Sequence, residues 1–296
     1  MPGNRFKIGI FAVNCAGGIT CTTVPERWEP TWENNLEISM MADETGLEFM
    51  LPLGRWAGYG GETDHNGRSF ETLTWASGLL AATQNIMAFS TLHVALIHPV
   101  FAAKQMVTAD HIGQGRFGLN IVCGWNVDEF GMFGVGLEEH SRRYDLGQEW
   151  LNIVKRIWTE DEPFNYEGTH YQIHDVVFNP PPVQYPRIPI WIGCKWQNKK
   201  PLKRAAKWEG VFPIPHKGET ITPENLRTIV KYIETYRDSD SDFDVALADH
   251  DGSRTPQSLA AYQRAGLTWW IQRIHSPWFN SLDEVRAHIQ KGPPSL

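Results

Sequence analysis

Glycine, amide and aromatic residues gather directly after the predicted β-strands of this 296-residue chain, where acidic pairs are scarce. The segments are 14–18, 54–61, 91–99, 123–129 and 193–198. In a sheet of parallel strands these positions share one edge, so their side chains can meet at one site. The mixture suits a planar, hydrogen-bonding ligand that carries a phosphate. It suits a hydrolytic metal centre less well, since such a centre needs clustered His, Asp or Glu ligands.

Three groups of residues in and near these segments allow a structural as well as a functional reading. Residues 58–61 could form a simple turn or a ligand-binding loop. His93 and His98 could cap a helix or lie in the core, and with His65 they could build a metal-dependent hydrolase. The Arg-Arg-Tyr run at 142–144 could begin a solvated helix or clamp a phosphate.

Eight short apolar runs alternate with amphipathic stretches, which is the pattern of parallel strands joined by helices. The predicted strands span residues 6–13, 47–53, 85–92, 116–123, 188–192, 210–214, 243–248 and 267–271. The predicted helices span residues 32–45, 71–83, 99–111, 201–208, 223–237, 256–265 and 281–291. Four of these helices are predicted to begin at a proline, because the missing N–H has no helical partner in the first turn.

Continuously apolar strands indicate a sheet covered on both faces, and a twisted parallel sheet of eight strands closes into a barrel. We therefore predict an α/β fold, a (β/α)8 TIM barrel that forms a single domain over residues 1–296. The alternative is an open doubly wound sheet, but no Gly-x-Gly-x-x-Gly motif follows the first strand. An insertion after the fourth strand, residues 124–187, should hold a helix over 141–158 and a hairpin over 164–173.

Composition and charge argue against several classes of protein. Asp and Glu number 34 against 27 Lys and Arg, so the chain lacks the overall basic balance of a nucleic-acid binder. No apolar run reaches the ~18 residues of a membrane span, and the N-terminal segment lacks the apolar stretch of a signal peptide. The four cysteines have no metal-ligand spacing. We therefore expect a cytoplasmic protein with reduced thiols and no metal site.

Several short motifs, taken together, resemble those of the bacterial luciferase-like, flavin-dependent monooxygenases. They are His98-Pro99, Ala103-Lys104, the TADH run at 108–111 and the GRFGLN run at 115–120. A branch of that family, which contains pyrimidine oxygenase and dimethylsulfone monooxygenase, is similar at 14–18, 57–61, 122–130 and 141–145. The close similarity covers roughly residues 8–178, and a looser one continues to about residue 275.

The resemblance implies a (β/α)8 barrel that binds reduced FMN, supplied by a separate NAD(P)H:flavin reductase. The flavin would pass electrons to O2, and the enzyme would oxygenate a small organic substrate, with cleavage of a C–S or C–N bond as one hypothesis. Family members commonly pair through barrel helices, so the resemblance also implies a homo-oligomer, either a dimer or a tetramer. The identity of the substrate stays open.

Matching positions imply roles for residues around the flavin ring. Gly54 and Arg55 match positions at the edge of the ring, and Asn120 and Glu129 match flavin contacts at and after the fourth strand. Thr91 and Asn120 match the small polar residues that border the oxygen pocket. We therefore take Thr91 and Asn120 as the catalytic pair.

Other matches concern the phosphate end of the flavin. Arg143 and Tyr144 match the pair that reaches the FMN phosphate and the ribityl chain. After the fifth strand the branch presents a Ser to the phosphate, whereas this chain has Cys194 and Lys195 there. We include these two residues in the expected cofactor site, with the Lys as a point charge in place of the Ser contact. The chain is also shorter than typical members of the branch.

Two other functions share the same barrel and motifs. A deazaflavin (F420)-dependent oxidoreductase would transfer a hydride without O2, and retained deazaflavin would favour it. A non-catalytic flavin-binding barrel would keep the flavin site and lose the oxygen chemistry. Tight FMN binding without coupled substrate oxidation would favour this last function.

Overall fold

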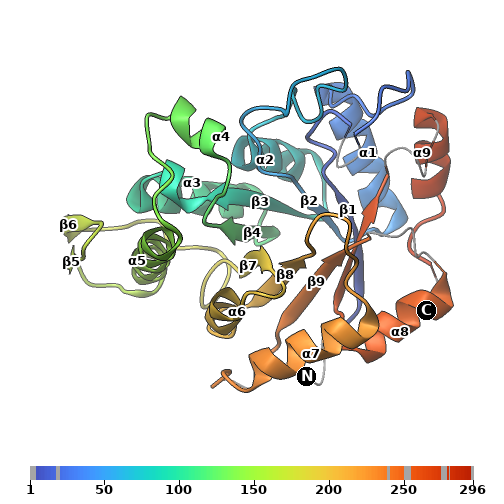
Figure 1. The fold of residues 1–296 in the computed structure, drawn as a ribbon. Coiled ribbons are helices and arrows are strands. Elements are labelled where there is room, and N and C mark those ends of the chain that lie inside the picture. Colours follow the sequence, from blue (N-terminus) through green and yellow to red (C-terminus); the bar gives the residue numbers. More distant parts are fainter. Residues whose placement is uncertain are drawn as a thin grey trace.

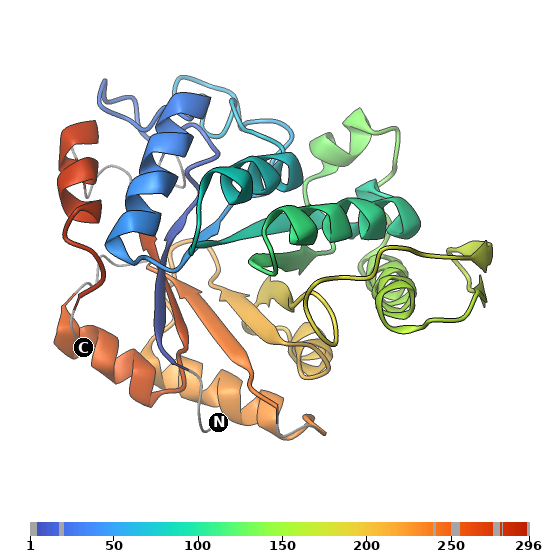
Figure 2. The same ribbon diagram turned by 180° about the vertical axis from the view of Figure 1, so that it is seen from behind.

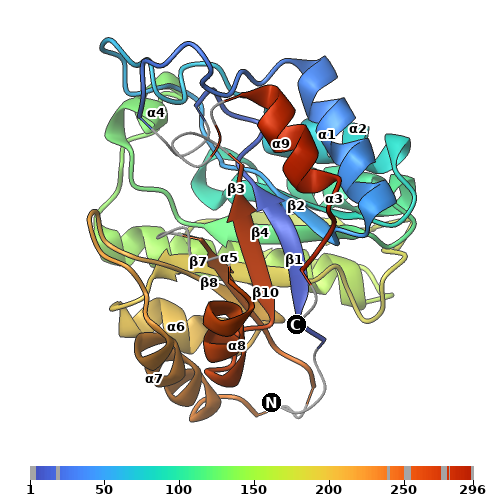
Figure 3. The same ribbon diagram turned by 90° about the vertical axis from the view of Figure 1, so that its right-hand side faces the viewer.

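The barrel predicted from the apolar runs is present and closed (Figure 1, and Figure 2 from behind). The structure, a computed structural model, describes residues 5–17, 21–238, 241–249, 255–274, 279 and 281–294. The parallel strands follow one another around the barrel as β1 (Lys7–Phe11), β2 (Phe49–Leu51), β3 (Met87–His93), β4 (Phe117–Val122), β7 (Ile190–Lys195), β8 (Gly210–Ile214), β9 (Asp244–Ala248) and β10 (Trp269–Arg273). Strand β10 then pairs with β1, from Trp269 opposite Lys7 to Arg273 opposite Phe11, which closes the barrel (Figure 3).

Helices cover the outside of the barrel between successive strands (Figure 2). They are α1 (Trp32–Thr45), α2 (Thr72–Ala82), α3 (Pro99–Ile112), α5 (His140–Thr159), α6 (Lys199–Ala205), α7 (Pro223–Glu234), α8 (Pro256–Arg264) and α9 (Leu282–Ile289). The Thr31 side chain caps α1 by accepting from the Asn34 N–H, and a capping box between Thr222 and Asn225 begins α7. Within the described part of the chain, no helix has both the length and the apolar character needed to cross a membrane.

Two apolar layers stabilise the barrel. Inside it, the rings of Phe49, Phe89, Trp191 and Trp269 pack against one another with centroids 4.2–6.2 Å apart. A larger apolar layer, of aliphatic and aromatic side chains, lies between the strands and the helices. Successive side chains of a strand alternate between the layers, as Trp191 and Ile192 do. Both faces of each strand are therefore apolar, which explains the continuous apolar runs in the sequence.

The chain leaves the barrel between β4 and β7, as the predicted insertion requires. This excursion contains α5 and a hairpin of β5 (Phe164–Glu167) and β6 (Gln172–Val176), which projects at the edge of the molecule (Figure 1). A short helix that was not predicted, α4 (Val127–Met132), comes first. Asn126 caps it by accepting from the Asp128 N–H at 3.1 Å. The Asn-x-x-Glu spacing at 126–129 is a helix-start signal that could have revealed α4.

Several predicted boundaries differ from the observed ones, and backbone chemistry explains two of the differences. Strand β2 spans only Phe49–Leu51 instead of 47–53, and it ends at Leu51 since Pro52 has no N–H to donate to a neighbouring strand. Helix α6 begins at Lys199 instead of 201. Pro201 lies at its third position, where the backbone N–H of a helix has no helical partner in any case.

Candidate functional site

Thr91 and Asn120, the predicted catalytic pair, lie next to each other near the carboxyl ends of β3 and β4. In Figure 1 these strands point toward the side that carries α4 and the long loops. The two residues are opposite each other in the strand register, and the Asn120 Nδ2 donates to the Thr91 Oγ1 over 3.2 Å. Thr91 itself donates to the Pro52 carbonyl over 2.7 Å. The Asn120 Oδ1 is buried and has no hydrogen-bond partner among the described residues, so it is an acceptor that lacks a donor.

Two glycines leave space around this pair. A Cβ atom on Gly193 would lie 2.8 Å from the Asn120 Oδ1, and a Cβ on Gly54 would lie 3.0 Å from the Thr91 carbonyl oxygen. Both distances are shorter than the ~3.5 Å of a favourable van der Waals contact. A larger residue at either position would therefore displace the polar pair or fill the space beside it.

A buried ion pair connects the loop after β2 to helix α4. The Arg55 Nη1 lies 3.5 Å from the Glu129 Oε1, and the two side chains are only 8% and 1% exposed. The same Glu129 oxygen accepts from the backbone N–H groups of Trp56 and Ala57 at 3.1 and 3.3 Å. Glu129 thus holds the loop in place. Within the described residues the Arg55 Nε and Nη1 make no hydrogen bond, so Arg55 keeps donors for a ligand.

Aromatic rings cover the Arg55 guanidinium group. Its Cζ lies 4.9 Å from the ring centroids of both Tyr59 and Trp125, and these two rings are within 23° of parallel. His65 stacks on Tyr59, with ring centroids 5.6 Å apart. The turn at 58–61 therefore carries an aromatic side chain that interacts with the cation at this rim of the barrel.

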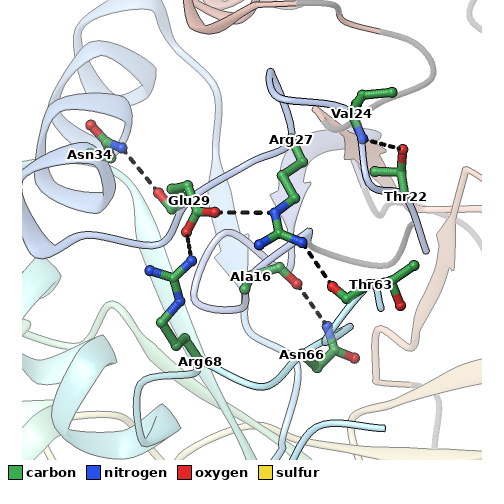
Figure 4. Close-up of polar contacts among 9 residues, drawn as sticks. All are labelled: Ala16, Thr22, Val24, Arg27, Glu29, Asn34, Thr63, Asn66 and Arg68. Atoms are coloured by element: carbon green, nitrogen blue, oxygen red, sulfur yellow. Dashed lines mark hydrogen bonds and ion pairs between the residues drawn. The ribbon is translucent and has the colours of Figure 1, made fainter. Parts of the chain in front are cut away.

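The loop after β1 is tied to the loop after β2 (Figure 4). The Arg27 Nη1 donates to the Thr63 carbonyl over 2.8 Å, and its Nε donates to the Glu29 carboxylate over 3.3 Å. Glu29 also forms an ion pair with Arg68, which belongs to the second loop. Gly18, part of the glycine motif at 14–18, lies outside the described residues. These contacts fix one side of the rim.

His93 lies at the end of β3, against the loop after β2. Its side chain is 8% exposed, and a Cβ atom on Gly54 would lie 3.1 Å from its Cε1. Burial lowers the pKa of His93 to about 4, while Glu129 acts to raise it and Arg55 acts to lower it further. The imidazole ring is therefore neutral at pH 7.

The three histidines considered as metal ligands have different surroundings. His65 stacks on an aromatic ring of its own loop, and His93 packs behind Gly54. His98 is exposed and lies edge-on to Tyr171, with ring centroids 5.6 Å apart. In the part of the chain that the structure describes, no three His, Cys, Asp or Glu side chains form a group that could hold a metal ion.

Arg143 and Tyr144 near the start of α5 form a cluster with Arg204 of α6. The Arg143 Nη1 donates to the Gly124 carbonyl over 2.6 Å. The Arg204 Nη2 donates to the Tyr144 carbonyl over 2.7 Å, and its Cζ lies 4.9 Å from the Tyr144 ring centroid. Burial raises the pKa of Tyr144 to about 12, although both guanidinium groups act to lower it. The Tyr144 phenol is therefore protonated at pH 7.

These two arginines carry positive charge that the described residues do not neutralise. Neither Arg143 nor Arg204 forms an ion pair with a described carboxylate, and the Nε of each is buried without an acceptor. Such a site attracts anions. Sequence reasoning missed Arg204, because it lies in a basic run at 199–204 and only helix packing brings it to α5.

Cys194 and Lys195, both predicted to belong to the cofactor site, lie at the end of β7. Cys194 belongs to the layer between strands and helices, and burial raises the pKa of its thiol to about 12, so it is uncharged. The Lys195 Nζ donates to the Pro215 carbonyl over 2.6 Å, and burial lowers its pKa. The Lys195 ammonium is therefore engaged by the loop after β8, whereas Arg204 has no carboxylate partner among the described residues.

A cleft of about 480 Å³ opens beside Thr91. Its walls come from the loop after β2, the start of α2, the end of β3, the short 3₁₀ turn η1 (Val94–Leu96) and the first half of α3. Gly54, Arg55 and His93 also line it. The cleft therefore shares part of its wall with the polar pair described above.

A family model described as luciferase-like monooxygenase matches residues 6–275. The pyrimidine monooxygenase RutA of Allorhizobium ampelinum is 29% identical over 231 residues, or 77% of this chain and 61% of that protein. The FMNH2-dependent dimethylsulfone monooxygenase of Pseudomonas putida is 31% identical over 204 residues, or 68% of this chain and 54% of that protein. The chain thus spans between about half and three fifths of the length of these curated relatives.

A solved structure, that of DmoA from Hyphomicrobium sulfonivorans, has the same fold. The two chains superpose with a TM-score of 0.74 over 97% of this chain and 89% of the other. Their sequences are 12% identical, so the likeness concerns the arrangement of the barrel.

Proposed function

The chain belongs to the luciferase-like monooxygenase family, and from that premise we propose that it is a two-component monooxygenase that acts with reduced FMN and O2. A separate NAD(P)H:flavin reductase would supply the reduced flavin, and a small organic molecule would be oxygenated. The relatives named above support this proposal, since both are monooxygenases and one is named for FMNH2.

The observation that carries the proposal is a set of polar atoms without hydrogen-bond partners around the mouth of the barrel. Within the described residues, these are the Asn120 Oδ1, the Arg55 Nε and Nη1, and the Nε atoms of Arg143 and Arg204. A flavin has N–H and carbonyl groups along one ring edge and a phosphate at the end of its side chain. An amide acceptor and guanidinium donors are the groups that such a molecule needs.

Residues at the strand ends would hold the ring. When bound, the reduced flavin supplies electrons to O2, which is the chemistry that the protein lacks. Thr91 fixes the Asn120 amide by accepting from its Nδ2, which leaves Oδ1 for a ring N–H. Gly54 and Gly193 keep the space beside this pair clear. Arg55 would donate to the polar ring edge.

Residues of α5 and α6 would hold the phosphate. We assign this role to Arg143, Tyr144 and Arg204, because the two cations lack carboxylate partners among the described residues. Cys194 is uncharged and the Lys195 ammonium is engaged elsewhere. Two guanidinium groups suit a phosphate dianion, since each can donate two parallel N–H bonds.

The test is a coupled assay with purified protein, FMN, a flavin reductase and NADH. We expect saturable binding of photoreduced FMN and oxygen-dependent turnover of at least one neutral heterocycle, sulfone or amine in a panel. If reduced FMN does not bind, or if every compound is returned unchanged while only free H2O2 forms, the proposal is wrong.

The Asn120→Ala variant distinguishes an effect on the reaction from an effect on folding. This change removes the free acceptor and should lower turnover at least tenfold, which is ~1.4 kcal/mol of activation free energy. The melting temperature should stay close to that of the wild type, because Asn120 makes one hydrogen bond to a side chain. Wild-type turnover in this variant would remove Asn120 from the site.

A further inference from the structure

The cleft beside Thr91 has no role in the flavin site proposed above, apart from the wall that the two share. Its volume of about 480 Å³ falls within the ~300–1,000 Å³ of small-molecule pockets. We infer that this cleft binds the organic substrate and that the substrate is a neutral, largely apolar molecule. The inference rests on the proposed function for the reaction, but the binding preference can be tested without flavin.

The wall of the cleft is mainly apolar. Aliphatic and aromatic side chains from α2, β3, η1, α3 and the C-terminal end of α4 face it, namely Leu73, Leu92, Leu96, Ile97, Phe101 and Phe133. Leu73 and Leu92 are buried and form the inner part, whereas Phe101 is 61% exposed at the outer end. A ligand seated against these groups would remove apolar surface from water, which favours apolar molecules by roughly 25 cal/mol per Å².

Arg55 and Glu71, which line the wall, already have their charges engaged. The Arg55 guanidinium lies 3.5 Å from the Glu129 carboxylate. Both carboxylate oxygens of Glu71 accept backbone N–H bonds at the start of α2, from Leu73 at 2.9 Å and Thr74 at 2.7 Å. The ring of His93 is neutral. An ionic ligand would lose its hydration without gaining an unpaired counterion, so burial of its charge would be unfavourable.

The cleft lies next to the residues that we assign to the flavin ring. Gly54 and Thr91 line the cleft, and Thr91 also binds the Asn120 amide. A molecule in the cleft would therefore lie beside the residues that we assign to the flavin ring. The polar atoms that we assign to the flavin would bind its ring edge and its phosphate, which leaves the apolar cleft for the compound that reacts with it.

Three probes of the same shape test the charge preference in the flavin-free protein. They are 2-naphthylmethanol, 2-naphthoate and 2-naphthylmethylammonium, and their dissociation constants are measured by isothermal titration at pH 7. We expect the neutral alcohol to bind at least tenfold more tightly than either ion. In Leu96→Trp, which fills the cleft, the affinity for the alcohol should fall at least tenfold. Met40→Trp, an exposed position on α1, is the matched control and should bind within twofold of wild type.

The outcomes separate this inference from the proposed function. Equal or tighter binding of either ion, no binding of the alcohol, or unchanged affinity in Leu96→Trp would overturn the inference. A parallel titration with FMN reports on the flavin site. FMN binding without the charge preference would refute the substrate class alone, and the charge preference without FMN binding would refute the monooxygenase alone.

Discussion

Arg204 brings a second guanidinium group to the start of α5, where Arg143 already lies. If the two cations hold a phosphate, Arg204→Met should weaken FMN binding at least tenfold, because one charge-assisted contact is lost. Riboflavin has no phosphate and should bind within threefold of its wild-type affinity. Quenching of flavin fluorescence gives both dissociation constants, and their ratio is the quantity to compare.

Arg237→Met is the matched control for that substitution. Arg237 donates to the carbonyls of Ala206 and Trp208 and takes no part in the cluster at α5. Its loss should lower the melting temperature and leave the ratio of FMN to riboflavin affinity unchanged. If Arg204→Met weakened both flavins equally, Arg204 would only brace α6 against α5.

His93 gives the protein a predictable response to acid. Its pKa is lowered from 6.5 to about 4 by burial, so between these values the unfolded chain binds a proton that the native state does not. Stability should therefore fall as the pH drops from 6.5 toward 4, by up to about 3 kcal/mol from this residue. In His93→Gln that part of the pH dependence should disappear. Urea unfolding at pH 7 and pH 4.5 measures the difference between the two proteins.

His174→Gln serves as the comparison for the acid response. His174 is exposed on β6, and its replacement should leave the wild-type pH dependence in place. A wild-type loss of stability that persists in His93→Gln would show that other groups cause it.

At the scale of elements, one buried carboxylate ties helix α4 to the loop after β2, beside the buried ring of Phe130. Glu129 accepts from the N–H groups of Trp56 and Ala57 and pairs with Arg55, while Val127 on the same helix is exposed. Glu129→Gln removes the charge and leaves Arg55 without its partner, which should cost about 3 kcal/mol. Hydrogen exchange should become faster at residues 55–57 and 127–132, as measured by mass spectrometry.

Asp128→Asn changes a neighbouring acid on the exposed face of α4 and is the control for that measurement. It should leave the exchange rates of both segments within twofold. Unchanged exchange in Glu129→Gln would mean that packing of the apolar side chains, and not the ion pair, fixes α4 on the loop after β2.

The residue types within and next to each strand and helix explain which of these elements could be predicted from the sequence. The strands were predictable because both of their faces are apolar, and α7 and α8 because a Thr and a Pro mark their first turns. Helix α4 escaped prediction because its six residues are too short to show a helical period. The start of α6 was misplaced because proline is compatible with any position in the first helical turn.

Within the candidate site, only contacts between neighbouring strands could be predicted from the sequence. Thr91 and Asn120 meet because β3 and β4 are neighbours in register, which follows from chain order in a parallel barrel. Arg204 and the cleft wall depend on how helices pack on the barrel, and no local pattern encodes that packing. The same holds for Lys195, whose ammonium bonds to a loop 20 residues further along the chain.

At the scale of the whole molecule, the aromatic interior should make the barrel unfold as one unit. Phe89 contacts three rings there, those of Phe49, Trp191 and Trp269, with centroids 4.2–6.2 Å away. Phe89→Ala would leave a cavity among strands from opposite sides of the barrel and should cost about 3–5 kcal/mol. Seven of the eight barrel strands contribute side chains to this interior, so tryptophan fluorescence and far-UV circular dichroism should still report a single, coincident urea transition.

The control for that experiment is Tyr185→Ala, since Tyr185 is 98% exposed and its loss should change stability by less than about 0.5 kcal/mol. Two separate transitions in Phe89→Ala would mean that the halves of the barrel fold independently. A cost below about 1 kcal/mol would mean that the interior is loosely packed. In a closed barrel neither is expected, because each strand is bonded on both sides and no free edge is available from which one half could open first.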